Sequence, residues 1–328
     1  MKTALITGAT GFLGRHLVAQ LSQAEPEIHL RLLCRSPWRD DLEKSTEVVL
    51  GDITSRSDVD RAVKGVDQIY HLAGIVQRQP KDPSLLYNTH VEGTRHVCEA
   101  MHRYGVSKAV FISTSGTIAV GHTPAERDET AKYATRTVEG WPYYTSKIDA
   151  EKLALKYVEE KELPIVIVNP SLLLGPGDDR FSSTQDIALF LEGQIMAIPS
   201  GGLNLVDVRD VAATIISAMH QGRIGERYLL GGVNWTFKEL ITHTAQISGL
   251  PTPKIEPPLW LALGSAKLLR ATMPLIGHEF KLDDESIRMS ACFWYCSTAK
   301  ARKELGLKTR DPMATLRETI SYIRFGSR

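Results

Sequence analysis

The feature that most constrains the fold is a glycine turn that follows the first apolar run of the chain. Residues 3–7 read Thr-Ala-Leu-Ile-Thr, and Gly8, Gly11 and Gly14 follow at three-residue spacing. A strand, such a turn and a helix in succession are the context in which a dinucleotide binds. Gly8 permits a tight turn, Gly11 a close approach of the pyrophosphate, and Gly14 close packing of helix on strand. We expect the cofactor to contact the whole turn: Gly8, Thr10, Gly11, Phe12, Leu13 and Gly14.

Apolar runs alternate with helical patterns from residue 1 to about residue 175, which is typical of βαβ units on a parallel sheet. Strands are expected at Thr3–Thr7, His29–Cys34, Val48–Leu50, Gln68–Leu72, Ala109–Ser113 and Ile165–Asn169. Helices are expected to begin near Gly14, Ser57, Tyr87 and Pro142. The pattern predicts an α/β Rossmann fold with a doubly wound parallel sheet.

Beyond residue 175 the alternation loosens, and glycines and prolines separate shorter elements. A chain of 328 residues has room for a second unit, so we expect a smaller mixed lobe at 176–328 that binds the substrate. Segments near 204–208 and 227–230 look like strands that return to the first sheet. The predicted division is therefore a dinucleotide-binding domain at 1–175 with those two returning strands, and a substrate lobe.

Composition excludes several classes of protein. The 39 basic and 38 acidic residues leave a net charge of +1, without the basic excess typical of nucleic-acid binding. Four scattered cysteines indicate reduced thiols, and no histidine spacing indicates a metal site. The apolar stretch 257–277 is interrupted by Lys267, Arg270 and Pro274, so we expect an amphipathic helix or pocket cover rather than a membrane span. The chain start has no signal-peptide pattern, and we expect a cytoplasmic protein.

The end of the second strand indicates which dinucleotide is used. An acidic residue there accepts the 2′-hydroxyl of NAD, whereas arginine accommodates the 2′-phosphate of NADP. The chain has Cys34-Arg35-Ser36 at this position, and the guanidinium of Arg35 matches a phosphate. NADP(H) is favoured, and NAD(H) is the alternative.

A candidate catalytic group lies further along the chain. Tyr143 and Lys147 are four residues apart, so both lie on one face of a helix. The ammonium of Lys147 is expected to lower the pKa of the Tyr143 phenol. Ser113-Thr114-Ser115 ends the fifth predicted strand about thirty residues earlier and supplies hydroxyls.

These motifs, in this order, resemble the extended short-chain dehydrogenases/reductases, the NAD-dependent epimerase/dehydratase family. The likeness extends over nearly the whole chain and is nearest to bacterial dihydroflavonol 4-reductase-like and hopanoid-associated sugar epimerase-like proteins. The segments that carry it are 168–171, 202–212 and 225–232. One departure is His90, where the family commonly has asparagine in Asn-Val-x-Gly-Thr; the histidine either donates a hydrogen bond or only packs.

The resemblance implies roles for particular residues. Ser115 would hold a carbonyl oxygen and Tyr143 would donate the proton. Both Tyr143 and Lys147 would also contact the cofactor, Lys147 at the nicotinamide ribose. Further cofactor contacts would come from Asp52 and Ile53 at the adenine, from Leu72, Ala73 and Gly74 at the ribose, and from Pro170 and Ser171 at the carboxamide. From its residues alone, Asp52 could equally cap the next helix. The resemblance also implies a homodimer through helices at 87–104 and 142–158.

The expected activity is NADP(H)-dependent interconversion of a carbonyl and an alcohol on a small, rather apolar molecule. One alternative is an epimerase or dehydratase of nucleotide sugars, or a sterol-type dehydrogenase. Residues 200–203 lack the arginine that sugar-nucleotide epimerases place there, and Ser115 lacks the acidic neighbour of the dehydratases. A second alternative is a non-catalytic dinucleotide sensor or assembly factor, although such proteins typically lose the tyrosine or lysine. Trp260 is expected in the core rather than against a ligand.

Overall fold

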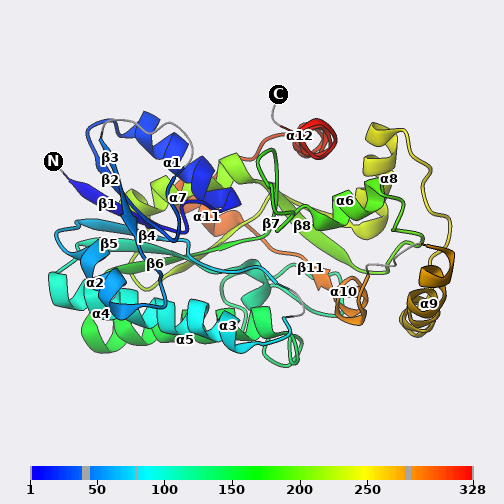
Figure 1. Ribbon diagram of the computed structural model, residues 1–328, viewed down its shortest axis with the longest axis horizontal. Coiled ribbons are helices and arrows are strands. Elements are labelled where there is room, and N and C mark those ends of the chain that lie inside the picture. Colours follow the sequence, from blue (N-terminus) through cyan, green and yellow to red (C-terminus); the bar gives the residue numbers. More distant parts are fainter. Residues whose placement is uncertain (1, 39–44, 78–79, 278–281, 327–328) are drawn as a thin grey trace.

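The computed structural model describes residues 2–38, 45–77, 80–277 and 282–326. Its larger sheet has seven parallel strands in the order β3-β2-β1-β4-β5-β6-β9 (Figure 1). These strands are β1 (Thr3–Thr7), β2 (His29–Cys34), β3 (Thr46–Leu50), β4 (Gln68–His71), β5 (Lys108–Ile112), β6 (Ile165–Pro170) and β9 (Arg227–Leu230). The predicted strands agree with them to within two residues at either end.

Helices cover both faces of this sheet, which confirms the predicted doubly wound Rossmann fold. One face carries α1 (Phe12–Ala24), α7 (Val208–Gln221) and α11 (Ala299–Leu305), and the other carries α2 (Arg56–Val63), α4 (Gly93–Tyr104) and α5 (Pro142–Lys161). Successive residues of a strand point to opposite faces. In β1, accordingly, Ala4 and Ile6 join the core beneath α1 and α7, whereas Leu5 joins the core beneath α2 and α4.

The smaller sheet is mixed and lies beside the cavity described below. Strand β8 (Gly202–Asp207) is antiparallel to β10 (Val233–Thr236) and parallel to both β7 (Leu172–Leu174) and β11 (Phe293–Trp294). The expectation that residues 204–208 return to the large sheet is therefore wrong, because β8 pairs with β7, which has already left that sheet. Strand β9 does pair with β6 in the large sheet, and the domain division at residue 175 stays a prediction.

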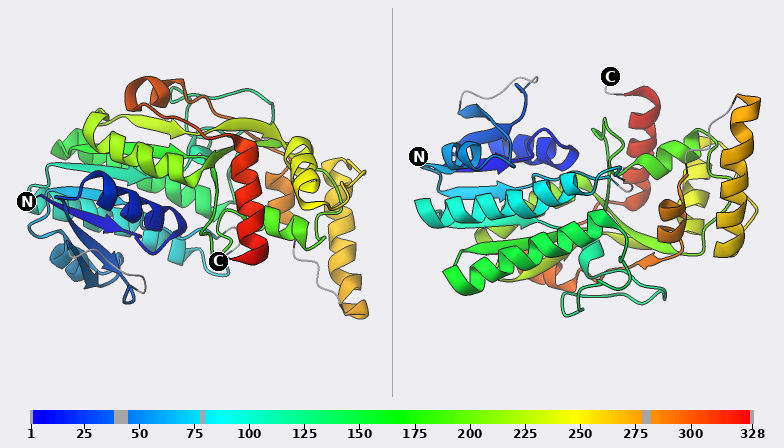
Figure 2. Two further views of the ribbon diagram at one scale, coloured as in Figure 1. Left: turned by 90° about the horizontal axis from the view of Figure 1, so that it is seen from above. Right: turned by 60° about the horizontal axis from the view of Figure 1, so that its bottom comes forward.

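The remaining helical elements lie partly around the smaller sheet and partly against α4 and α5. They are α3 (Ser84–Tyr87), the π-helical segment η1 (Asn88–Glu92), the 3₁₀ turns η2 (Ser115–Thr117) and η3 (Met273–Ile276), α6 (Gln185–Leu191), α8 (Phe237–Ser248), α9 (Leu259–Thr272), α10 (Asp284–Met289) and α12 (Pro312–Phe325). Helix α9 stands at the end of the molecule farthest from the N-terminus (Figure 2). No helix of the described residues is long and apolar enough to cross a membrane.

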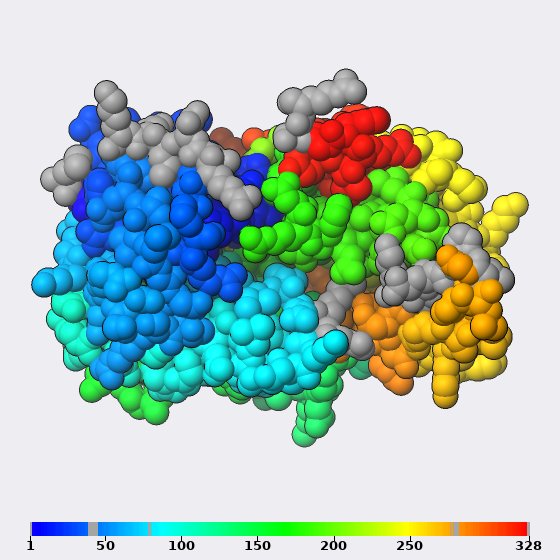
Figure 3. All heavy atoms as spheres, in the orientation of Figure 1, coloured from blue at the N-terminus to red at the C-terminus, as the bar shows by residue number. Residues whose placement is uncertain are grey.

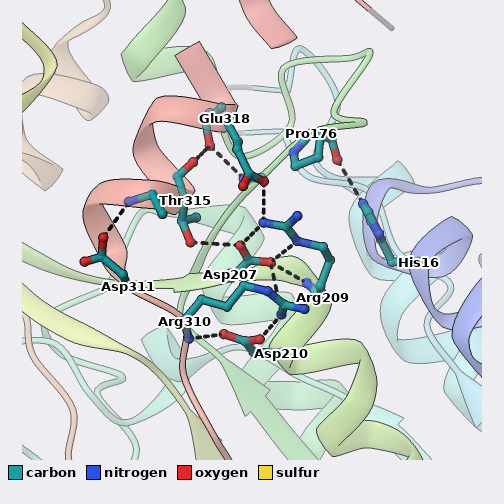
Figure 4. Close-up of polar contacts among 12 residues, drawn as sticks. His16, Pro176, Asp207, Arg209, Asp210, Arg310, Asp311, Thr315 and Glu318 are labelled. Carbon is teal, nitrogen blue, oxygen red and sulfur yellow. Dashed lines mark hydrogen bonds and ion pairs between the residues drawn. The ribbon is translucent and has the colours of Figure 1, made fainter. Parts of the chain in front are cut away.

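A polar cluster at the end of β8 ties the two parts of the molecule together (Figure 4). The buried carboxylate of Asp207 accepts hydrogen bonds from the backbone N–H and guanidinium of Arg209 and from the hydroxyl of Thr315 in α12. Arg209 also pairs with Glu318 at 2.6 Å. Burial alone would raise the pKa of Asp207, but the bonds from Arg209 and Thr315 hold that pKa below its ordinary value.

Candidate active site

The glycine turn after β1 is too close to neighbouring backbone to accept side chains. Gly8 has φ +72°, and a Cβ there would lie 2.7 Å from the backbone of Leu72 and Ala73. A Cβ on Gly14 would lie 2.2 Å from the carbonyl oxygen of Gly8. The N-cap Gly11 offers no capping side chain, so the first N–H groups of α1 remain for a ligand, as a pyrophosphate requires. The turn therefore fits a dinucleotide.

A second loop lies over the start of α1. His16 donates from Nε2 to the carbonyl oxygen of Pro176 at 2.9 Å. The next residue, Gly177, has φ +100°, and a Cβ on it would lie 3.4 Å from Nε2 of His16. Asp178 accepts hydrogen bonds from the backbone of residues 182–184, which holds the loop in shape. The space-filling view shows a hollow between the green segment near β7 and the cyan segment below it (Figure 3). The residues that we expect to bind the dinucleotide lie along these loops.

The candidates after β2 and β3 lie in different environments. Arg35 is exposed, and none of the described residues forms a hydrogen bond or ion pair with it. Asp52 accepts hydrogen bonds from the backbone and hydroxyl of Thr54, whereas the cap of α2 is Ser55, so Asp52 closes a turn and is not the helix cap. Ile53 is buried, and a Cβ on Gly93 would lie 3.0 Å from its side chain.

The strand ends β4 and β6 bring further candidates to the same edge. A Cβ on Gly74 would lie 3.3 Å from Nε2 of His90 and 3.4 Å from Nζ of Lys147, so the backbone after β4 passes close to both side chains. The backbone N–H of Ala73 donates to Thr7 at 3.1 Å. Pro170 is buried, and Ser171 donates from its hydroxyl to Asn204 at 2.7 Å while it also lines the cavity.

Helix α5 presents Tyr143 and Lys147 to the end of β5. Lys147 donates from Nζ to the carbonyl oxygen of Ile112 at 3.0 Å. The hydroxyl of Tyr143 is hydrogen-bonded to the side chain of Thr114, a partner that the sequence reasoning did not select. Ser115 is buried and lines the same cavity, and Ser113 points away, donating to Glu151 at 2.5 Å. The structure thus brings Thr114 and Ser115 together with Tyr143, and Thr114 is in contact with it.

The pKa expected for Tyr143 is wrong in direction. Burial raises the pKa of Tyr143 to about 12, with the Thr114 hydrogen bond acting the other way. Burial also lowers the pKa of Lys147 to about 8, opposed by the charge of Glu151. The ammonium is directed at the Ile112 carbonyl, which explains why it does not lower the pKa of the phenol. Tyr143 therefore holds its proton at neutral pH.

His90 fixes the position of α5 as a neutral ring. Its Nε2 accepts the backbone N–H of Ile75 at 3.0 Å, so the proton is assigned to Nδ1, which donates to Ser146 at 2.8 Å. Its ring meets that of Tyr143 edge-on, with centroids 5.8 Å apart. Burial lowers the pKa of His90 to about 2. The histidine at the family's asparagine position thus donates a hydrogen bond and also packs.

Glu151 is a buried carboxylate that sequence reasoning missed. One oxygen accepts from Ser113, Thr117 and Asn169, and the other accepts from Tyr133 and faces Arg227 at 3.4 Å. It lies two turns after Tyr143 and one after Lys147, so the four-residue spacing on α5 would have revealed it. These contacts connect α5 with the ends of β5, β6 and β9 and so hold the two catalytic candidates in place.

A cavity of about 320 Å³ extends from these hydroxyls toward α9. Its inner end is lined by Thr114, Ser115 and Tyr143. Its walls are mostly apolar and include Ile187, Phe190, Leu240, Ile241, Leu269 and Ile287. Among the described residues no lysine or arginine lines it. No group of described histidine, cysteine, aspartate and glutamate side chains could hold a metal ion.

Aromatic side chains form one wall of this cavity beside Tyr143. Tyr144 and Trp294 have ring centroids 4.9 Å apart, and Trp294 stacks on Trp141 at 5.9 Å. Trp260, which we expected in the core, is 73% exposed and does not line the cavity. Its helix is apolar on the outside as well as the inside, so no single stripe marks the buried face.

The chain is similar to known proteins over most of its length. The model of the NAD dependent epimerase/dehydratase family matches residues 4–231. A Synechocystis protein named “Putative dihydroflavonol 4-reductase” is 33% identical, covering 97% of this chain and 94% of its own. Sterol demethylase protein B of Methylococcus capsulatus is 30% identical and covers 98% of both chains. The crystal structure of gox2253 is 31% identical with a TM-score of 0.84, covering 99% of this chain and 98% of its own.

The family match, the two relatives of this length and the geometry of the site agree. The described residues of this chain hold a glycine turn that fits a dinucleotide and a tyrosine–lysine pair on one helix beside strand-end hydroxyls. The chain therefore belongs to the NAD-dependent epimerase/dehydratase family and is an NAD(P)-dependent oxidoreductase of the extended short-chain dehydrogenase/reductase type.

Proposed function

We propose that this protein uses NADP(H) to interconvert a carbonyl and an alcohol on an uncharged, apolar molecule. The observation that carries the proposal is the position of Tyr143 and Thr114 at the inner end of a largely apolar cavity. Among its described lining residues there is no cation for a diphosphate, which argues against a nucleotide sugar. The relative named sterol demethylase protein B favours a polycyclic, lipid-like substrate, for which the aromatic wall of Tyr144 and Trp294 is suited.

Chain residues along the strand ends would hold the dinucleotide, which supplies a hydride when bound. The glycine turn of residues 8–14 would receive the pyrophosphate, and Arg35 the 2′-phosphate. Lys147 would hold the ribose hydroxyls beside Gly74. The remaining contacts that we propose are Asp52 and Ile53 at the adenine, Leu72 and Ala73 at the ribose, and Pro170 and Ser171 at the carboxamide.

Tyr143 would give its proton to the carbonyl oxygen in the reductive direction. Because burial keeps the phenol protonated at neutral pH, it is a competent general acid. Thr114 and Ser115 would orient the oxygen that receives the proton. Lys147, fixed by its hydrogen bond to the Ile112 carbonyl oxygen, would act by holding the ribose rather than by charge on the phenol. A homodimer and a cytoplasmic location stay predictions.

The cofactor assignment is tested by titrating NADPH and NADH into the wild type and into Arg35→Ala. We expect NADPH to bind more tightly, and the preference to shrink by about tenfold or more in the variant, since a charge-assisted bond to phosphate is lost. Arg136→Ala is the matched control, because Arg136 is also exposed and lies on another loop. Tighter binding of NADH to the wild type would instead favour an NAD-dependent epimerase.

The catalytic assignment is tested with Tyr143→Phe on a panel of apolar ketones and alcohols. We expect kcat to fall by roughly 10²–10⁴-fold, the range for loss of a general acid, while NADPH affinity stays within about twofold. Tyr144→Phe is the control, since it removes the neighbouring phenol of the same cavity. If the wild type binds NADPH but turns over no member of the panel, a non-catalytic sensor is favoured.

A further inference from the structure

Helix α9 has two apolar faces, and the first of them lines the cavity. Leu259, Ala262, Ala266 and Leu269 all line it, and Ala266 is the one described residue of the helix that is fully buried. These positions repeat at three- and four-residue spacing, so they form one stripe. The helix therefore forms the outer wall of the proposed substrate site.

The second face of α9 points away from the protein. Trp260 is 73% exposed and Leu268 64%, and both lie on the same side of the helix as Gly264 and Ala271. Leu261 next to them is also exposed, and Leu275 in η3 is 82% exposed. Five of the twelve large apolar side chains that stand exposed in the described chain fall between residues 255 and 275. Large apolar side chains exposed together on one side of a helix, as Trp260 and Leu268 are, indicate a surface that a partner covers.

The charged residues within α9 itself, Lys267 and Arg270, are both basic. Residues 257–277 contain no aspartate or glutamate. Arg270 is engaged with Asp284 and with the carbonyl oxygen of Leu282, and the nearby Glu256 pairs with Lys238. Lys267 on the outer face and Lys254 before the helix are exposed. The partner that matches this surface is therefore apolar and anionic.

We propose that the outer face of α9 docks on an anionic phospholipid bilayer. Tryptophan and leucine beside lysine on a helix without acidic residues are the composition of helices that lie in the membrane interface. Helix α9 stands at one end of the molecule, clear of the large sheet (Figure 2), so a flat surface reaches it without meeting the dinucleotide-binding part. A second copy of the chain fits less well, because pairing of the two helices would bring like-charged Lys267 side chains together.

The consequence for the reaction rests on the proposed function. One side of α9 would contact the lipid, and its other side lines the cavity. A lipid-soluble ketone or alcohol would therefore pass from the bilayer to the site without crossing water. Binding to lipid does not require turnover, so it can be measured even if the proposed reaction is wrong.

The test is sedimentation of the full chain with vesicles of phosphatidylcholine alone or with equal parts of phosphatidylglycerol. We expect binding to the anionic vesicles, weakened by salt, and a loss of about tenfold or more in the double variant Trp260→Ser, Leu268→Ser, which removes two apolar contacts. Lys267→Glu should weaken binding to anionic vesicles alone. Ile224→Ser, 55% exposed near β9, is the matched control.

Two results would overturn the proposal. One is a wild-type chain that stays in the supernatant with both vesicle types, and the other is a double variant that sediments as the wild type does. Light scattering tests the alternative that a second copy of the chain covers this face. If the wild type is a dimer, the double variant is a monomer and neither binds vesicles, the face is an interface between copies. NADPH affinity of the variants, expected to be unchanged, shows that they are folded.

Discussion

Thr114 contacts the phenol of Tyr143, whereas Ser115 only lines the same cavity. We therefore expect removal of the two hydroxyls to affect the reaction rate to different extents. We expect Thr114→Val, which keeps the shape, to lower kcat by about ten- to a hundredfold, because a hydrogen bond to the reacting group is lost. Thr114→Ser should retain most of the activity, and Ser115→Ala should lose less than Thr114→Val. Steady-state kinetics with NADPH measure these losses. A larger loss of kcat in Ser115→Ala than in Thr114→Val would mean that Ser115, not Thr114, orients the reacting oxygen.

The same residues show where sequence reasoning stops at this scale. Tyr143 and Lys147 could be found because a helix places every fourth residue on one face. Thr114 could not, because neighbours in an extended chain point to opposite sides and a run of three hydroxyls does not say which side faces α5. The direction of the Tyr143 pKa also depends on burial, which only the folded structure supplies.

At the scale of the element, the contact between α1 and β1 depends on Gly14. A Cβ there would overlap the carbonyl oxygens of Gly8 and Ala9, which are backbone atoms that cannot turn aside. We expect Gly14→Ala to weaken NADPH binding by at least about tenfold and to destabilise the protein by roughly 1–3 kcal/mol, as overpacking does. Fluorescence titration and urea unfolding measure the two effects.

Gly264→Ala in α9 is the matched control for this change. Gly264 is also helical, but a Cβ there meets nothing within 4 Å. In a helix alanine is favoured over glycine by about 0.5–1 kcal/mol, so this variant should be slightly more stable with unchanged affinity for NADPH. Equal behaviour of the two variants would mean that the turn does not need Gly14.

Elements were predicted well where a single physical pattern controls them. Strands buried on both faces read as continuous apolar runs, and β1 and β2 lie at the residues expected. Strand β8 was assigned to the wrong sheet because its apolar sequence does not distinguish one buried sheet from another. Trp260 was misplaced because α9 is apolar on two faces, a pattern that looks like a core helix.

At the scale of the whole molecule, two buried neutral histidines govern stability toward acid. Burial lowers the pKa of His71 to about 3 and that of His90 to about 2, whereas both are near 6.5 when unfolded. Below about pH 6.5 the unfolded chain binds two protons that the folded chain does not. We therefore expect the free energy of unfolding to fall by about 1.4 kcal/mol per pH unit for each histidine.

Urea unfolding between pH 6 and pH 4.5, above the range in which most carboxylates titrate, checks this slope. His90→Asn, which restores the residue common in the family, should reduce the slope of unfolding free energy against pH by about 1.4 kcal/mol per pH unit, the contribution of one histidine. His102→Gln is the control, since His102 is exposed on α4. An identical slope in wild type and His90→Asn would contradict the assignment of a neutral His90.

The order of strands in the large sheet has a consequence for how such proteins can be recombined. Strand β9 closes the edge beside β6, and α7 covers α1, although both come from the second half of the chain. A fragment ending at residue 175 would leave β6 as an open edge and much of the apolar surface of α1 in water. Exchange of the substrate lobe between relatives by one crossover at that residue therefore also exchanges β9 and α7, so the contacts of β9 with β6 and of α7 with α1 would join residues of two parents.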